Sequence, residues 1–463
     1  MKLRRWQNEC VDQALTTYAT KQAHFLCLAT PGAGKTVMAS ELAAQLFDTG
    51  QIDFVLCFAP SVSVVSGFIT TFERRLNKRM DGKIGAAGGA YTYQAMLHLG
   101  DDFWLLLKHY RVLVVFDEIH HCSGFELDTA NAWGETILLQ IRDKAKFSLA
   151  MTGTPWRSDD APIVMARYLD PDARLHCDYV YGLRNAVTDD VCRKPVVTLI
   201  DASSVKVAGE TFKSLAKALS VSDLEYSAVL HEPNAMTYAL ELGVNQLNLC
   251  RKSMPNAGGL IVASSIAHAK QLKQILCNQL NQSAVIVTYK EHEPQSVINS
   301  FKVTNTKWIV SVGMVSEGTD IPRLQVCCHL STVRTELYFR QILGRVLRKI
   351  SGIDNEFGYL ITFAEESLLT YADRILQEVP ESEVRLKTNE YEKPEPTQGK
   401  ANADVPVTGR ESAGKKAEIT FGFAESQVDH PIDFVNEPKD FLSWSFNGVF
   451  RQKIISVFSQ PFI

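Results

Sequence analysis

Short continuous apolar runs alternate with helically spaced segments in the first third of the chain. Runs rich in Val, Ile, Leu and Phe are typical of strands that a parallel sheet buries on both faces. Residues 36–47, between the first two runs, have the spacing of a crossover helix, so we expect an α/β sheet. The predicted strands are residues 25–29, 53–59, 112–116 and 148–152.

A second series of apolar runs begins after residue 255, with a helical stretch at 267–280. Each series has the size of one domain, and 463 residues are too many for one ordinary core. We therefore predict two α/β lobes. The predicted strands of the second lobe are residues 259–264, 284–289, 307–312, 325–330 and 359–363.

The segments outside the two series differ in composition, and they set the predicted domain boundaries. Residues 387–416 are poor in large apolar side chains and rich in Pro, Gly, Lys and Glu, which is typical of a disordered linker. Aromatic residues return beyond it, but their role cannot be assigned. We predict lobe 1 at 1–185, a partly helical connector at 186–255, lobe 2 at 256–386, the linker at 387–416 and a small C-terminal element at 417–463.

Charge and cysteine content narrow the class of protein only slightly. The net charge of −4 does not point to a basic nucleic-acid binder, although a locally basic groove remains compatible with it. The ten cysteines form no CxxC pair, so we expect reduced thiols and neither a zinc ribbon nor a disulfide framework. No apolar run follows the basic start and none reaches eighteen residues, so we expect a cytoplasmic protein without signal peptide or membrane span.

The sequence ATPGAGKT at 29–36 follows a predicted strand and opens a predicted helix. Gly32 and Gly34 let main-chain N–H groups converge on phosphate oxygens, and the helix N-terminus favours an anion. Lys35 can reach the β and γ phosphates of ATP, and the Thr36 hydroxyl can bind Mg²⁺. The strict pattern has Gly where Ala29 stands, so this is a looser phosphate-binding loop.

The sequence VLVVFDEIHH at 112–121 supplies two carboxylates at the end of a buried strand. That end is the sheet edge where ligands of open α/β folds bind. We expect Asp117 to hold Mg²⁺ and Glu118 to orient and deprotonate an attacking water. Together with the glycine-rich loop, the pair predicts a nucleoside triphosphate site in lobe 1.

A third motif, QILGRVLR at 341–348, lies in the second series. On a helix, Gln341, Arg345 and Arg348 are spaced at i, i+4 and i+7 and share one face. A planar, always charged guanidinium suits the charge that develops on a γ-phosphate, as in an arginine finger.

In this order, the motifs resemble the superfamily 2 helicases of the DExH group, over roughly residues 3–348. LRRWQ at 3–7 is similar to the adenine-recognition segment of the branch with type III restriction subunits and bacterial repair helicases. The resemblance implies two RecA-like lobes, Gln7 on the adenine edge and Arg4 nearby.

The resemblance also assigns coupling and strand-contact residues. It implies that His120, Thr152 and Thr154 couple nucleotide state to lobe closure. SEGTDIP at 316–322 is similar to a lobe-interface motif, which implies Asp320 near the nucleotide and Glu317 and Gly318 near nucleic acid. Ser61, Thr92 and Gln94 fall where the family contacts the phosphate backbone, a contact that positions a strand without reading bases.

The hypothesis that follows is an ATP-driven helicase or translocase whose site is completed by both lobes, with ATP and Mg²⁺ as cofactors. The resemblance favours DNA as partner over RNA, within a restriction, repair or defence complex. An RNA helicase, or an ATP-gated subunit of such a complex without unwinding activity, stays open. A nuclease built on Asp433, Glu437 and Lys439 is disfavoured, because Pro438 suits poorly the central strand that such a site needs.

Overall fold

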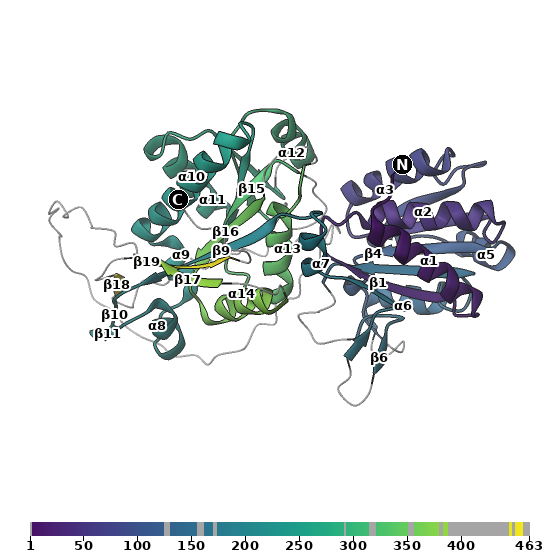
Figure 1. Ribbon diagram of the computed structural model, residues 1–463, viewed down its shortest axis with the longest axis horizontal. Helices are drawn as coiled ribbons and strands as arrows, with labels where there is room; N and C mark the ends of the chain where they lie inside the picture. The colour runs from purple at the N-terminus through teal and green to yellow at the C-terminus, as the bar shows by residue number, and fades with distance from the viewer. Residues whose placement is uncertain are drawn as a thin grey trace, which may run out of the picture.

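The computed structural model of the chain describes two α/β lobes, one from each apolar series. Figure 1 shows the lobes side by side, with α7 (Leu183–Thr188) and α13 (Glu336–Val346) where they meet. The structure describes residues 2–124, 130–154, 162–169, 174–290, 293–313, 321–350, 356–378, 383–387, 444–446 and 450–456.

Lobe 1 contains a parallel sheet of six strands in the order β3-β2-β4-β5-β1-β8. All six residues of β4 are buried, as its continuous apolar run predicts. The four predicted strands of this lobe are confirmed as β1, β2, β4 and β5. The strands are β1 (His24–Ala29), β2 (Phe54–Ala59), β3 (Gly88–Thr92), β4 (Val112–Asp117), β5 (Phe147–Thr152) and β8 (Tyr179–Tyr181).

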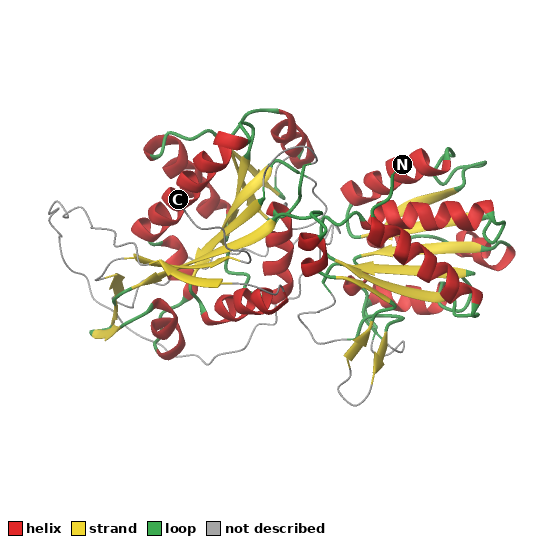
Figure 2. Cartoon of the chain, in the orientation of Figure 1, coloured by secondary structure: helices red, strands yellow, loops and turns green. Residues whose placement is uncertain are grey.

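Helices flank this sheet on both sides (Figure 2). The predicted crossover helix is confirmed as α2 (Lys35–Asp48), which packs against α1 and α3. A short antiparallel pair, β6 (Arg167–Leu169) and β7 (Arg174–His176), lies beside the lobe. The other helices are α1 (Arg5–Ala19), α3 (Val62–Leu76), α4 (Tyr93–Met96), α5 (Asp101–His109) and α6 (Ala132–Gln140), with a 3₁₀ turn η1 (Ile119–His121).

Lobe 2 contains an eight-stranded sheet in the order β13-β14-β12-β15-β16-β9-β19-β17. The first six strands are parallel, whereas β19 and β17 are added antiparallel at one edge. The five predicted strands are confirmed as β12 to β16. The strands are β9 (Lys194–Ala202), β12 (Gly258–Ala263), β13 (Ala284–Thr288), β14 (Trp308–Val312), β15 (Leu324–Leu330), β16 (Phe357–Phe363), β17 (Glu383–Lys387) and β19 (Phe450–Ser456).

Several helices of lobe 2 begin at side-chain caps. Ser265, Thr335 and Glu232 each accept a hydrogen bond from a main-chain N–H in the first turn of the helix that follows. Pro233 occupies the first turn of α10, where a missing N–H costs nothing. The helices are α8 (Leu215–Val221), α9 (Tyr226–His231), α10 (Pro233–Ser253), α11 (Ile266–Gln274), α12 (Pro294–Val303), α13 and α14 (Glu366–Glu378), with a π-helical turn at 275–279.

The stretch 186–255, which we predicted as a connector, contributes β9 to the sheet of lobe 2. β9 pairs with β16 over seven residues, and α10 packs on β12, β15 and β16. A small sheet of β11 (Glu210–Phe212), β10 (Val205–Val207) and β18 (Trp444–Phe446) adjoins it. The domain boundaries themselves stay a prediction.

The region beyond residue 387 is described only at 444–446 and 450–456. Both segments pair with lobe 2: β18 with β10, and β19 between β9 and β17. Phe450 stacks on Tyr238, with ring centroids 4.6 Å apart, and the buried Gln452 donates to the Tyr238 hydroxyl at 2.7 Å. Apart from Lys387, the last residue of β17, the predicted linker 387–416 lies outside the described residues. The nuclease candidates Asp433, Glu437 and Lys439 also lie outside them.

Candidate ATP site between the two lobes

The glycine-rich loop joins β1 to α2, as the sequence predicts. Gly32 and Gly34 have φ of 83° and 95°, in the left-handed region that glycine adopts without strain. Gly34 is the residue before α2, so the loop delivers its N–H groups to a helix N-terminus. Thr36 lies in the first turn of α2 and is partly buried. This geometry fits a bound phosphate.

The segment LRRWQ contacts this loop directly. The Arg4 guanidinium donates to the Ala33 carbonyl at 2.6 Å, and the Gln7 amide donates to the Gly34 carbonyl at 2.9 Å. The Gln7 oxygen accepts from the Arg4 main-chain N–H at 2.8 Å, which fixes the start of α1. Both side chains thus lie against the loop, and their roles toward adenine stay a prediction.

Lys35 and Glu118 form a buried ion pair, with Lys35 Nζ 2.8 Å from Glu118 Oε1. Lys35 also donates to the Ala29 carbonyl at 3.3 Å. Burial alone would lower the pKa of Lys35, but Glu118 and Asp117 raise it above its ordinary value. Burial opposes ionisation of Glu118, yet Lys35 and His120 hold the pKa of this carboxyl well below its usual range. Both groups are therefore charged at neutral pH.

Glu118 adopts an unusual backbone conformation, with φ 48° and ψ 52°. A non-glycine residue in this left-handed region carries strain, and such strain is often found at functional sites. The conformation follows β4 directly, and the Glu118 carboxylate accepts from the Gly153 main-chain N–H at 3.1 Å. The strained turn therefore joins the ends of β4 and β5.

Asp117 is the last residue of β4 and is almost completely buried. Burial and the neighbouring Glu118 raise the pKa of Asp117 to about 7. Its Oδ1 has no hydrogen-bond partner, and an orphaned buried carboxylate oxygen is costly unless a ligand satisfies it. A divalent cation would supply that partner, so the residues present fit Mg²⁺.

The three predicted coupling residues lie together beside Glu118. His120 Nδ1 is 2.8 Å from Thr152 Oγ1 and 3.4 Å from Glu118 Oε2. The Thr152 hydroxyl donates to the Thr154 carbonyl at 2.9 Å. All three side chains are buried, so a displacement of Glu118 would be felt at the end of β5. Their role in coupling stays a prediction.

The segment 341–348 of lobe 2 lies against the loop of lobe 1. A Cβ built on Gly344 would lie 2.8 Å from Pro31 Cβ, so only glycine permits this approach. Arg348 Cγ would lie 3.1 Å from a Cβ built on Gly32. A cavity of about 60 Å³ borders the contact and is lined by residues of both lobes, among them Thr30, Pro31, Gly153, Arg340 and Leu343.

One expectation about this segment is wrong. Gln341 and Arg345 lie on α13 and are largely buried, but the helix ends at Val346, so Arg348 does not continue their helical face. Arg348 instead forms an isolated antiparallel bridge with Cys192, and the Leu347 carbonyl accepts from the Arg193 N–H at 2.7 Å. Pairing with this second segment replaces the last helical turn.

The described residues among the predicted nucleic-acid contacts have local structural roles. Ser61 precedes α3, and its hydroxyl lies 3.3 Å from that of Ser63. The Thr92 hydroxyl accepts from the Ala95 N–H at 3.0 Å and caps α4, whereas Gln94 is partly buried within that helix. Glu317, Gly318 and Asp320 lie outside the described residues.

Two contributors to the site are not evident from side-chain motifs. The Gly153 N–H binds Glu118 through the main chain, which a sequence pattern does not reveal. The Tyr93 hydroxyl donates to the Asp117 carbonyl at 2.7 Å and is fully buried. Tyr93 is the middle residue of TYQ, of which only the flanking polar residues carried a predicted role.

Comparison with protein families gives two matches in chain order. Residues 1–157 match the model described as "Type III restriction enzyme, res subunit", and residues 243–349 match "Helicase conserved C-terminal domain". The first holds the phosphate-binding loop and the two carboxylates, and the second holds Gln341, Arg345 and Arg348. The matches thus cover both halves of the described site.

Similar proteins are found among curated sequences. An uncharacterized protein of Mycobacterium tuberculosis is 30% identical over 365 residues, which are 75% of this chain and 59% of that protein. The chain thus spans about three-fifths of the length of this relative. The DNA 3′-5′ translocase XPB2 of Sulfurisphaera tokodaii is 23% identical over 385 residues, covering 75% of this chain and 79% of that protein.

Solved structures share the fold at low sequence identity. A fragment described as an HsdR subunit of a type I restriction enzyme from Vibrio vulnificus superimposes with a TM-score of 0.59 and 18% identity, covering 82% of this chain and 67% of that one. The Type ISP restriction-modification enzyme LlaBIII, bound to DNA, gives a TM-score of 0.53 and 15% identity, over 82% of this chain and 30% of that one. The two-lobe architecture is therefore RecA-like. Among the described residues, no helix combines the length and apolar character of a membrane span.

Proposed function

Because the chain belongs to the superfamily 2 helicases, in the group that resembles type III restriction subunits, we propose that it hydrolyses ATP between its lobes to move along or remodel DNA. The observation that carries this proposal is the contact between α13 and the glycine-rich loop. It brings the arginine-bearing segment of lobe 2 to the loop whose Lys35 pairs with Glu118.

In the proposed reaction, the residues of lobe 1 bind the triphosphate and prepare the water. The loop amides and Lys35 hold the β and γ phosphates, and Gln7 and Arg4 face the adenine side of the loop. Glu118, whose depressed pKa keeps it ionised, orients the attacking water and accepts its proton. A triphosphate competes with Glu118 for Lys35, and this competition frees the carboxylate for the water.

Asp117 and Thr36 would hold Mg²⁺, and the ion would neutralise phosphate charge there. The buried Asp117 oxygen without a partner is the feature of this chain that supports the assignment. Arg345 and Arg348 of lobe 2 stabilise the charge that develops on the γ-phosphate, and Gln341 lies on the same helix as Arg345.

Closure of the lobes follows from the shared site. ATP favours the closed arrangement because its γ-phosphate contacts both lobes, and hydrolysis removes that preference. If each lobe grips the nucleic-acid backbone, through Ser61, Thr92 and Gln94 in lobe 1 and Glu317 and Gly318 in lobe 2, repeated closure moves the strand. His120, Thr152 and Thr154 relay the state of Glu118 to the end of β5.

DNA is proposed as the partner because two of the similar proteins named above act on DNA or bind it by name. XPB2 is a DNA translocase, and LlaBIII was solved bound to DNA. We also propose a cytoplasmic location and a place in a restriction, repair or defence complex. An RNA helicase, or an ATP-gated subunit without unwinding activity, is the alternative within the same fold.

The testing experiment measures ATP hydrolysis with no nucleic acid, single-stranded DNA, duplex DNA and RNA. We expect stimulation by DNA, and loss of hydrolysis in K35A, because the ammonium contacts the transferred phosphate. R111A serves as the control, since Arg111 directly precedes β4 and pairs with Asp53, at the end of that strand away from the site. Stimulation by RNA alone selects the RNA helicase, and hydrolysis that ignores all three selects the gated subunit. Hydrolysis by K35A at the wild-type rate would overturn the proposal.

A further inference from the structure

Arg193 is one of the largest fully buried side chains of the protein, with an exposed fraction of 0%. It lies between α7 and β9, where the chain passes from lobe 1 to lobe 2. Its guanidinium donates to main-chain carbonyls of Leu324 at 2.5 Å, Val346 at 2.9 Å and Pro322 at 3.2 Å. Val346 is the last residue of α13, so the crossover segment is tied to the helix that carries Arg345.

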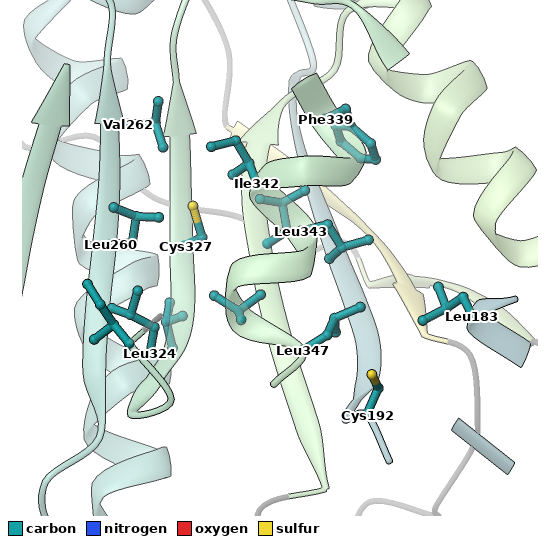
Figure 3. Packing of buried hydrophobic residues seen from close by; sticks show 14 of the residues in the cluster. Leu183, Cys192, Leu260, Val262, Leu324, Cys327, Phe339, Ile342, Leu343 and Leu347 are labelled. Carbon is teal, nitrogen blue, oxygen red and sulfur yellow. The ribbon is translucent and has the colours of Figure 1, made fainter. Parts of the chain in front are cut away.

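The main chain around Arg193 reinforces this tie. The Arg193 N–H donates to the Leu347 carbonyl at 2.7 Å, and Cys192 bridges Arg348. Figure 3 shows Leu347 and Cys192 at the end of α13. Cys192 Sγ also lies 3.8 Å from the Pro31 carbonyl of the glycine-rich loop. One short segment therefore contacts both the arginine-bearing end of lobe 2 and the loop of lobe 1.

Arginine suits this position better than lysine. The last four carbonyls of a helix have no partner within the helix, and a cation near them is favourable. A planar guanidinium can reach several carbonyls at fixed angles, whereas a single ammonium on a flexible stem cannot. Burial lowers the pKa of Arg193 to about 10, so the side chain still carries its charge at neutral pH.

We propose that Arg193 is a positioning residue for the arginines of lobe 2. It fixes the end of α13 to the crossover segment, so that Arg345 and Arg348 meet the γ-phosphate in one geometry when the lobes close. This inference rests on the proposed function, because Arg193 acts only through the arginines that stabilise the transferred phosphate.

Arg323 provides a matched control within the same lobe. It is also buried, 4% exposed, and its guanidinium donates to carbonyls of Phe301, Asn256 and Thr306. Burial lowers its pKa to about 10 as well. These carbonyls belong to segments around β12 and β14 rather than to α13. Arg323 lies between Pro322 and Leu324, whose carbonyls Arg193 binds, and R323K removes the same chemistry there while the contacts of Arg193 with Val346 and Leu347 stay in place.

The experiment is a double-mutant cycle on the full chain, measuring kcat and KM for ATP with saturating DNA. We expect R193K to lower kcat roughly 10- to 100-fold, as misplacement of a catalytic group by about 1 Å does, while KM changes less than about 3-fold. In the R345A/R348A background, R193K should cost no more than about 2-fold further, because its effect passes through these two arginines. R323K should change kcat less than about 3-fold per folded molecule in either background, and thermal unfolding gives the folded fraction.

The outcomes separate this inference from the function on which it rests. Wild-type hydrolysis by R345A removes the arginine assignment itself, whatever R193K does. An impaired R345A together with an unimpaired R193K overturns only the role of Arg193. Equal multiplicative losses from R193K in both backgrounds also overturn it, because a structural defect lowers both equally. Failure of R193K and R193Q to fold while R323K folds assigns Arg193 to the fold alone and overturns the positioning role.

Discussion

The two lobes share one architecture but contribute unequally to the site. Lobe 1 collects its residues from the carboxyl ends of three adjacent strands, β1, β4 and β5, and from the start of α1. Among the described residues, lobe 2 approaches the same loop through the end of α13 and the segment that follows it. Lobe 1 thus forms the candidate phosphate site, and lobe 2 contributes positively charged side chains from across the interface.

This asymmetry suggests that binding and turnover can be separated by mutation. Main-chain N–H groups, Lys35 and the orphaned Asp117 oxygen all belong to lobe 1, so in the proposed mechanism that lobe alone holds the nucleotide and its metal. An arginine supplied from across an interface acts mainly on the transition state. Variants of lobe 2 should therefore retain binding and lose catalysis.

The largest expected effect comes from removing the arginine of α13. R345A should lower kcat by roughly a thousandfold or more, because it removes charge stabilisation at the γ-phosphate. Its affinity for a non-hydrolysable ATP analogue should stay within about 3-fold of wild type, since lobe 1 makes the ground-state contacts. Calorimetric titration with the analogue checks this, and a parallel loss of affinity would end the separation between lobes.

A smaller loss is expected from the carboxylate of lobe 1. E118Q keeps the shape of the side chain but cannot accept a proton, so kcat should fall by roughly 10²- to 10⁴-fold. Because the neutral amide of this variant no longer holds Lys35 in an ion pair, analogue affinity should hold or rise. Single-turnover hydrolysis measures the first quantity, and a wild-type rate would exclude Glu118 as the base.

β19, the strand added antiparallel to β9 in lobe 2, allows a test of folding stability that does not involve catalysis. Phe450 is buried and stacks on Tyr238, so F450A should lower the unfolding free energy of lobe 2 by about 3 kcal/mol. Hydrogen exchange of β9 amides reports this loss, while β4 amides in lobe 1 should not change. V221A, at a position that is 54% exposed, is the control and should stay within about 0.5 kcal/mol. Equally faster hydrogen exchange in β9 and β4 would contradict the expectation that Phe450 stabilises lobe 2 alone.

The smallest expected effect, per pH unit, is a dependence of the stability of lobe 2 on pH. Burial lowers the pKa of His329 to about 4, while the unfolded chain titrates near 6.5. Between those values the unfolded state binds a proton that the folded state does not, so the stability of lobe 2 falls as pH decreases, by about 1.4 kcal/mol per pH unit at most. H329F should reduce this slope for β15 amides in hydrogen exchange. An unchanged slope would mean that the pKa of His329 is the same in the folded and the unfolded state.

The sequence predicts local elements better than long-range pairing. Every continuous apolar run that we assigned as a strand lies in a sheet, because burial on both faces leaves a clear pattern. Residues 194–202 escaped assignment although PVVTLI is apolar, since their partners β16 and β19 lie far along the chain. β16 was assigned as a strand from its own apolar run, but neither its residues nor those of β9 reveal that the two strands pair.

The site shows the same limit. The glycine-rich loop, the two carboxylates and the arginines were recognised because each motif consists of characteristic side chains at a fixed spacing. The helix end at Val346 was missed, since the main-chain bridge between Cys192 and Arg348 that replaces the last turn depends on a distant segment. Gly153, Tyr93 and Arg193 bind through or to the main chain, and such contacts are set by the fold rather than by residue type.

The position of β19 has a consequence for how the protein is made. All strands of the first sheet come from residues 24–181, so that lobe can finish folding while the ribosome is still translating the rest. The second sheet must wait for residues 450–456, and until they arrive β9 presents an open edge on which other chains can add. A chain whose translation stops before residue 450 would therefore have a folded lobe 1 and an aggregation-prone lobe 2.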